Sequence, residues 1–222
     1  MSEKIAKDVL VFAHPDAAHP QHLSVAAARL ITLAREITSG KVVALAPSSI
    51  TPQHFSQVGV KKVYYFNPEE TGTWQVGAIL ADLVVSAVRS SDFGVVLLPS
   101  TSWGRDAAGQ GAILLGSGAS VDVTSLKVAD GKLIAGKSVL DGTWETSYYM
   151  RRGIPVVAMR TTSLSAVPAA EAGEVETENL PVQLRESTKR IQVVSREETG
   201  STHAGLTEAP VVVCVGRGVN SD

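Results

Sequence analysis

The 222-residue chain has little of several residue types, and each shortage excludes a class of protein. It contains one cysteine, Cys214, so it forms no disulfide within the chain and fits a reducing compartment. Lysine and arginine together number 20 against 22 acidic residues, so no basic excess points to a nucleic-acid surface. No stretch reaches the roughly 18 consecutive apolar residues of a membrane span, and the polar N-terminus lacks the apolar run of a secretory signal. These absences predict a soluble, cytoplasmic protein without membrane insertion or a nucleic-acid partner.

Several motifs that carry nucleotide or hydrolytic chemistry are also missing. No Gly-x-Gly-x-x-Gly follows the first apolar run, and none of Gly109, Gly111, Gly116 and Gly118 is followed by the Lys-Ser/Thr of a phosphate loop. The nucleophile elbow Gly-x-Ser-x-Gly is absent as well. The tryptophans Trp74, Trp103 and Trp144 are scattered along the chain, and we expect them to be packing residues.

The first half of the chain alternates apolar runs with amphipathic stretches. Apolar runs such as residues 8–13 are typical of strands buried on both faces of a parallel sheet, and stretches such as 22–38 have apolar residues at helical spacing. Strands are expected at 8–13, 41–46, 62–66 and 93–99, and helices at 22–38, 51–58, 73–89 and 105–115. This order predicts an α/β fold whose mostly parallel sheet has helices on both faces.

Beyond residue 118 the pattern favours further strands. They are expected at 119–128, 132–135 and 154–160, with extra antiparallel edge strands toward the C-terminus at 182–184 and 190–194. The acidic stretch 166–179 is poor in bulky residues and predicts a surface loop. The last apolar run, starting at residue 209, predicts a buried strand that places Cys214 in the core and leads into a glycine-rich turn.

The loop after the first expected strand suggests a metal site. Ala13-His14-Pro15-Asp16-Ala17 resembles the Ala-His-Pro-Asp-Asp motif of zinc-dependent N-acetylglucosaminide deacetylases, in which the histidine and the second aspartate bind zinc. Ala17 replaces that aspartate here, and His19 or His22 would supply a ligand only in a different geometry. An exposed loop histidine beside a proline is the favoured interpretation. A deacetylase-like hydrolase using His14 and Asp16 stays an alternative.

A second candidate site follows the fourth expected strand, at residues 99–106. Loops at the carboxyl ends of parallel strands are where doubly wound sheets bind anions, because helix-terminal amides favour negative charge. Ser102 or Asp106 would alternatively cap the helix, and Arg105 would pair with a neighbouring loop. A nucleotide-binding regulatory domain is therefore another open alternative.

Several blocks in order resemble the alpha subunit of an electron-transferring flavoprotein. They are the block 95–106 with its Gly-Arg-Asp, the Leu-Gly at 115–116, residues 121–126, Ala-Gly-Lys at 135–137, 154–160, and 206–218. That resemblance implies a fold of the adenine-nucleotide-hydrolase-like kind. It further implies an N-terminal α/β domain over residues 1–208, with 209–222 as the start of a truncated FAD-binding domain.

The resemblance also implies a function. It implies a non-catalytic scaffold and partner-binding domain, paired with a beta subunit as a heterodimer and receiving electrons from dehydrogenases through FAD. Only Gly216, Arg217 and Gly218 match cofactor-binding positions, and Val215 replaces the first glycine of the family's Gly-Gly-Arg-Gly. Because the family holds most of its FAD in a later domain, this chain alone is expected to bind no FAD tightly. No catalytic residue and no metal ligand are assigned.

Overall fold

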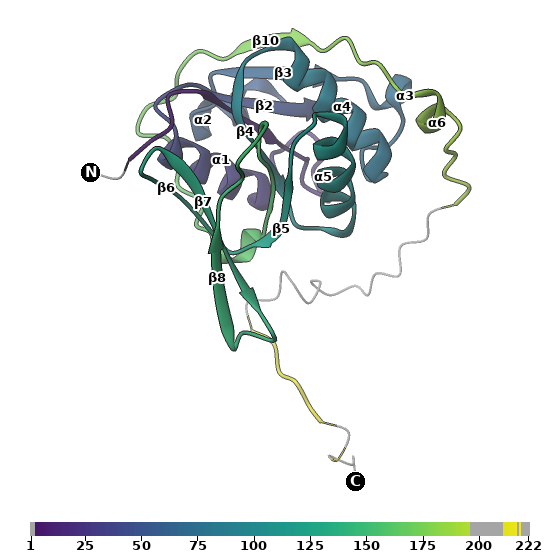
Figure 1. Ribbon diagram of the computed structural model, residues 1–222. Coiled ribbons are helices and arrows are strands. Elements are labelled where there is room, and N and C mark those ends of the chain that lie inside the picture. Colours follow the sequence, from purple (N-terminus) through teal and green to yellow (C-terminus); the bar gives the residue numbers. More distant parts are fainter. Residues whose placement is uncertain (1–2, 196–210, 217, 219–222) are drawn as a thin grey trace. The chain divides into compact units, whose positions relative to one another are not determined.

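The computed structural model describes residues 3–195, 211–216 and 218, and the chain divides into two units, Met1–Lys189 and Arg190–Asp222. Within the described residues, the first unit contains a seven-stranded sheet in the order β10-β3-β2-β1-β4-β9-β5, and all neighbouring strands pair in parallel (Figure 1). The strands are β1 (Asp8–Phe12), β2 (Val42–Pro47), β3 (Lys62–Phe66), β4 (Phe93–Pro99), β5 (Ala119–Val123), β9 (Val156–Met159) and β10 (Glu176–Asn179). The expected α/β fold with a mostly parallel sheet is confirmed.

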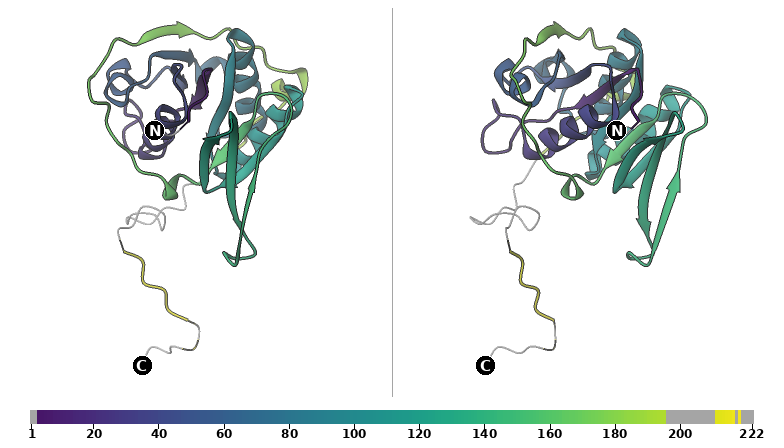
Figure 2. Two further views of the ribbon diagram at one scale, coloured as in Figure 1. Left: turned by 60° about the vertical axis from the view of Figure 1, so that its left-hand side comes forward. Right: turned by 90° about the vertical axis from the view of Figure 1, so that its left-hand side faces the viewer.

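Helices cover both faces of this sheet, which is visible when the two views of Figure 2 are compared. The helices before β5 are α1 (Val25–Ile37), α2 (Pro52–Val58), α3 (Pro68–Thr71), α4 (Gly77–Ser90) and α5 (Ser102–Leu114). Helices α1 and α2 contribute to one hydrophobic cluster, whereas α4 and α5 pack against each other in a second cluster on the opposite face. The short α3 was not expected from the sequence, because four residues carry too little helical periodicity.

The central strand β1 shows how the sequence produces this layered core. Its side chains alternate between the two clusters: Val9 and Val11 pack on the α1 face, and Leu10 and Phe12 on the α4 face. All four are fully buried, as expected for a strand with helices on both sides. Helix α1 begins after Ser24, whose Oγ accepts a hydrogen bond from the Ala27 amide at 3.1 Å.

A second, antiparallel sheet contains β6 (Ser125–Ala129), β7 (Lys132–Val139) and β8 (Trp144–Tyr148). The single strand expected over 119–128 is therefore wrong: β5 belongs to the main sheet and β6 to this one. The chain changes sheets near Asp122, which adopts a left-handed backbone with φ of 55°. Strand β8 was not expected, because its residues up to Ser147 are exposed and carry no apolar alternation.

The first unit ends differently from the sequence-based expectation. No strand forms at 182–184 within the described residues, and a short helix α6 (Glu186–Lys189) follows. In the acidic stretch expected to be a loop, Glu176–Asn179 instead forms edge strand β10 beside β3. Lys62 of β3 explains this pairing, since its Nζ lies 2.8 Å from Glu176 and 2.6 Å from Glu178.

In the second unit, two expected strands do not form in the part that the structure describes. The edge strand expected at 190–194 is absent, and residues 190–195 are exposed. The buried strand expected from residue 209 is wrong for its described part, since 211–216 form no strand and are exposed. Cys214 is exposed rather than a core thiol. Among the described residues, no helix is both long and apolar enough to cross a membrane.

Candidate functional site

The strand order places a topological switch point between β1 and β4. From β1 the chain proceeds outward to β2 and β3, and then returns to β4 on the other side of β1. The loops that follow β1 and β4 therefore lead to helices on opposite faces of the sheet. In open α/β sheets this crevice, at the carboxyl ends of the strands, is where ligands bind.

Aromatic rings pack together at this switch point. The ring of His14, which follows β1, lies 5.7 Å from the Trp74 ring and 5.6 Å from the Trp103 ring, measured between centroids. The two tryptophan rings are 4.9 Å apart, and Phe12 packs on both at 5.5 and 5.8 Å. The expectation that Trp74 and Trp103 are packing residues fits this cluster, whereas Trp144 is 66% exposed, so that expectation is wrong for it.

His14 is part of this cluster rather than an exposed loop histidine. Its Nδ1 lies 3.1 Å from the Pro15 carbonyl oxygen, and its Nε2 lies 3.3 Å from Ser24 Oγ. Because a carbonyl only accepts, Nδ1 carries the proton and Nε2 accepts from the serine hydroxyl. Burial lowers the pKa of His14. The neutral imidazole thus links the β1 loop to the residue that caps α1.

The remaining residues of the proposed zinc loop have structural contacts. Asp16 Oδ1 accepts hydrogen bonds from the amides of Ala18 and His19, each at 3.0 Å, which forms a tight turn. The His22 ring stacks on that of His19, with centroids 5.2 Å apart, and packs at a tilt against that of His54, with centroids 4.6 Å apart. In the part of the chain that the structure describes, no group of three or more His, Cys, Asp or Glu side chains is placed to hold a metal ion. Asp16 therefore forms a local turn, and His14 belongs to the aromatic cluster.

The loop after β4 is organised by close packing at the start of α5. Thr101, rather than Ser102 or Asp106, caps the helix, since its Oγ1 accepts from the Gly104 amide at 3.0 Å. A Cβ at Gly104 would lie 1.9 Å from the Pro99 carbonyl oxygen, so glycine is required for the helix to begin this close to β4. Asp106 accepts from Gln110 Nε2 at 3.0 Å. These contacts explain the glycine and the first-turn polar residues without a phosphate ligand.

Arg105 pairs across this edge of the sheet, as the sequence suggested. Its Nη1 lies 3.3 Å from Asp122 Oδ1, and Ser100 Oγ donates to the same oxygen at 2.8 Å. The Asp122 amide donates back to Ser100 Oγ at 3.1 Å. The Ser100 hydrogen bond, followed by Arg105, holds the pKa of the Asp122 carboxyl below its usual value. Sequence reasoning did not find Asp122, because its role depends on the left-handed bend in β5.

Removing the charge of Asp122 is expected to reduce stability in a pH-dependent way. Asn tolerates the left-handed backbone, so Asp122→Asn removes the charge-assisted contacts alone and should cost about 1 kcal/mol near neutral pH. A carboxyl whose pKa is lowered on folding stabilises above its unfolded pKa of about 3.9 and loses that effect as pH falls. Urea unfolding of both proteins should therefore give a difference at about pH 7 that shrinks toward about pH 3. A difference that is constant with pH would contradict the assigned contacts.

The residues proposed to bind a flavin lie in the second unit. Gly216 and Gly218 are exposed, and a Cβ built on either would meet no atom within 4 Å. Arg217 lies outside the described residues. The described glycines thus form no cradle that fits a flavin.

The corresponding prediction is that the purified chain does not retain FAD. Because a Cβ built on Gly216 or Gly218 meets no described atom within 4 Å, the purified chain is expected to show no flavin absorption in the visible range. An absorption spectrum of the protein after extensive dialysis against FAD-free buffer measures this directly. Flavin bound in stoichiometric amount would overturn the prediction.

Fold and site together define a doubly wound α/β domain whose switch-point crevice contains packed aromatic rings, and comparisons with known proteins identify its family. The model of the electron transfer flavoprotein domain matches residues 9–184. The electron transfer flavoprotein subunit alpha of Mycobacterium leprae (strain TN) is 29% identical over 203 residues, which cover 90% of this chain and 62% of the relative. Its Mycobacterium tuberculosis (strain ATCC 25618 / H37Rv) counterpart is 27% identical over 162 residues, covering 72% of this chain and 50% of the relative.

The chain therefore belongs to the electron transfer flavoprotein family. It spans less than two thirds of the length of the curated relatives that it matches. The resemblance seen in the sequence blocks is confirmed by the family match, which covers most of the first unit.

Proposed function

We propose that this chain is the N-terminal scaffold and partner-binding domain of an electron transfer flavoprotein alpha subunit. Its partner would be a beta-type subunit, and its setting the cytoplasm. In the complete subunit, FAD held mainly by residues outside this chain would supply reversible electron transfer, with dehydrogenases as the donors. Within the chain itself no residue is assigned a catalytic role, so the described residues contribute structure and a contact surface.

The observation that carries this proposal is the exposed antiparallel sheet. In the first unit the hairpin of β7 and β8 extends away from the main sheet, as Figures 1 and 2 show. Leu140 in its turn is 71% exposed, and Trp144 at the start of β8 is 66% exposed. Strand β8 pairs only with β7 among the described strands, so its outer edge has free backbone groups. An exposed tryptophan beside a free strand edge is typical of a protein–protein contact.

The switch-point crevice supports the same function. The rings of Trp74, Trp103 and His14 pack together where a doubly wound sheet would otherwise receive a nucleotide. Arg105, in the first turn of α5, forms an ion pair with Asp122. Both features favour a structural domain over the nucleotide-binding alternative.

The hairpin provides the test of this function. Replacing its two exposed large apolar side chains, in Leu140→Ser/Trp144→Ser, is expected to weaken capture of the beta-type subunit from the same genome by about tenfold or more. The measurement is a pull-down titration with the tagged chain. Both side chains are mostly exposed, so the variant should keep the stability of the parent protein.

A matched control is available on α5. Ile113 is 80% exposed and lies outside the antiparallel sheet, so Ile113→Ser removes a similar apolar side chain without touching the hairpin. Its capture of the beta-type subunit should equal that of the parent chain. Failure of the parent chain to capture the subunit at all would refute the proposed function, and equal capture by the hairpin variant would refute the assigned surface.

A further inference from the structure

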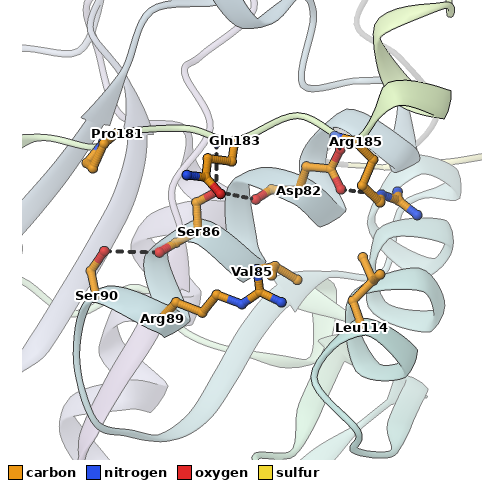
Figure 3. Close-up of a pocket in the computed structure, with 9 residues that line it drawn as sticks. All are labelled: Asp82, Val85, Ser86, Arg89, Ser90, Leu114, Pro181, Gln183 and Arg185. Carbon is orange, nitrogen blue, oxygen red and sulfur yellow. Dashed lines mark hydrogen bonds and ion pairs between the residues drawn. The ribbon is translucent and has the colours of Figure 1, made fainter.

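A pocket of about 310 Å³ lies on the outer side of α4, in the first unit and outside the switch-point crevice (Figure 3). Its lining residues on α4 repeat at helical spacing and form one face of that helix, while the segment before α6 closes the opposite side. The lining residues are Asp82, Val85, Ser86, Arg89, Ser90, Leu114, Pro181, Gln183 and Arg185. The volume is at the lower end of the range of roughly 300–1,000 Å³ found for small-molecule sites.

The only acidic group in the pocket lining is already neutralised. Asp82 is 3% exposed, and its Oδ1 lies 2.5 Å from Arg185 Nε. Its second oxygen accepts from the backbone amide of Arg185 at 3.0 Å. Both carboxylate oxygens are thus occupied by one residue, and Asp82 contributes no free negative charge to the pocket.

The two arginines of the lining, in contrast, have N–H donors without a partner among the described residues. Within the described residues, the Arg89 guanidinium has no hydrogen-bond or ion-pair partner, and Figure 3 shows its side chain extended among the lining residues. Arg185 uses Nε and Nη2 for Asp82, Ala78 and Gln110, which leaves Nη1 without a partner in the same part of the chain. The side-chain amide of Gln183 is likewise unpaired there.

The dipole of α4 disfavours anion binding only at the end of the pocket near the C-terminus of the helix. Arg89 and Ser90 belong to the last turn of the helix, where backbone carbonyls carry partial negative charge. Asp82, which positions Arg185, lies two turns earlier, and the dipole's effect falls off within the final turn. Because Asp82 and Arg185 pair, the net positive charge of the lining belongs to Arg89, and the half of the pocket near Arg185 lies outside the last turn of the helix.

We infer that this pocket binds a small oxyanion, the carboxylate or phosphate group of a small molecule, between Arg89 and Arg185. A guanidinium offers paired N–H donors that match either group, and one positive charge remains after Asp82 and Arg185 pair. Arg185 is held in place by its contacts to Asp82 and Gln110, so one side of the site is preorganised. None of the lining residues belongs to the β7–β8 hairpin, and the inference does not rest on the proposed function.

The inference is tested by titrating the isotope-labelled chain with inorganic phosphate, and separately with succinate, at constant ionic strength. The side-chain Nε–H signals of Arg89 and Arg185 are followed by NMR, and chloride serves as the blank. A saturable shift of these signals with either probe is expected, and the probe that saturates identifies the preferred group. Arg89→Gln should weaken the affinity for the probe about tenfold. Arg89→Lys keeps the charge but not the paired donors, so its affinity should lie between those of the parent chain and Arg89→Gln.

Arg151→Gln is the control, because Arg151 is an exposed arginine outside the pocket lining. The affinity of this variant for the probe should match that of the parent chain. Arg89 is itself exposed, so its variants are expected to fold, which their amide spectra will show. Shifts that fail to saturate with both probes, or that persist unchanged in Arg89→Gln, would overturn the inference.

Discussion

Gly104→Ala is expected to destabilise the first unit by about 3 kcal/mol, at the upper end of the usual cost of overpacking. The added Cβ would lie 1.9 Å from the Pro99 carbonyl oxygen, a backbone atom at the end of central strand β4. A flexible side chain would move aside, but this oxygen moves only with β4 or with the first turn of α5. For a chain of this size the corresponding fall in melting temperature is about 6–12 °C, measured by thermal unfolding.

Gly109 in the same helix is the matched control for this substitution. A Cβ at Gly109 would meet no atom within 4 Å, so Gly109→Ala adds only helix propensity and should stabilise by up to about 1 kcal/mol. Opposite effects from the same chemical change in one helix would isolate the close approach at Gly104 as the cause. Equal effects of the two substitutions would show that the packing of α5 on β4 is wrongly described.

Arg185→Met is expected to cost about 2–3 kcal/mol, because it leaves the buried carboxylate of Asp82 without its charged partner. The expected cost is below that of a fully buried pair, since the Arg185 side chain is 34% exposed. Urea unfolding of the variant measures the loss. The pair also holds the segment before α6 against α4, so amide exchange at residues 182–185 should accelerate in the variant.

The double variant separates the ion pair from simple packing. In Asp82→Leu/Arg185→Met no buried charge remains, and the stability should recover by about 1–2 kcal/mol relative to Arg185→Met alone. A double variant that is less stable than the single one would mean that Arg185 stabilises through its stem and not through Asp82.

Much of the main sheet was predictable because its strands are apolar on both faces. The bounds expected for β3 and β4 match those observed, and β1 differs by one residue. Prediction failed where long-range pairing decides the structure. Strand β10 is acidic and would repel itself as a free segment, but Lys62 binds two of its carboxylates. Strand β8 is exposed along most of its length, so no hydrophobic pattern identifies it.

The candidate site was only partly predictable for the same reason. The pairing of Arg105 with a neighbouring loop was anticipated, but not its partner Asp122, whose position depends on the bend between two sheets. The loop motif at His14 suggested a metal because the sequence does not reveal that Trp74 and Trp103 surround the imidazole. Family membership, in contrast, was evident from the order of several short blocks and is confirmed by the match over residues 9–184.

The most direct test of the proposed function is the solution mass of the chain co-expressed with the beta-type subunit from the same genome. Light scattering on the purified material is expected to give the summed mass of one chain and one beta-type subunit. A mass equal to that of the chain alone, with the beta-type subunit recovered separately, would contradict the assignment as a partner-binding domain.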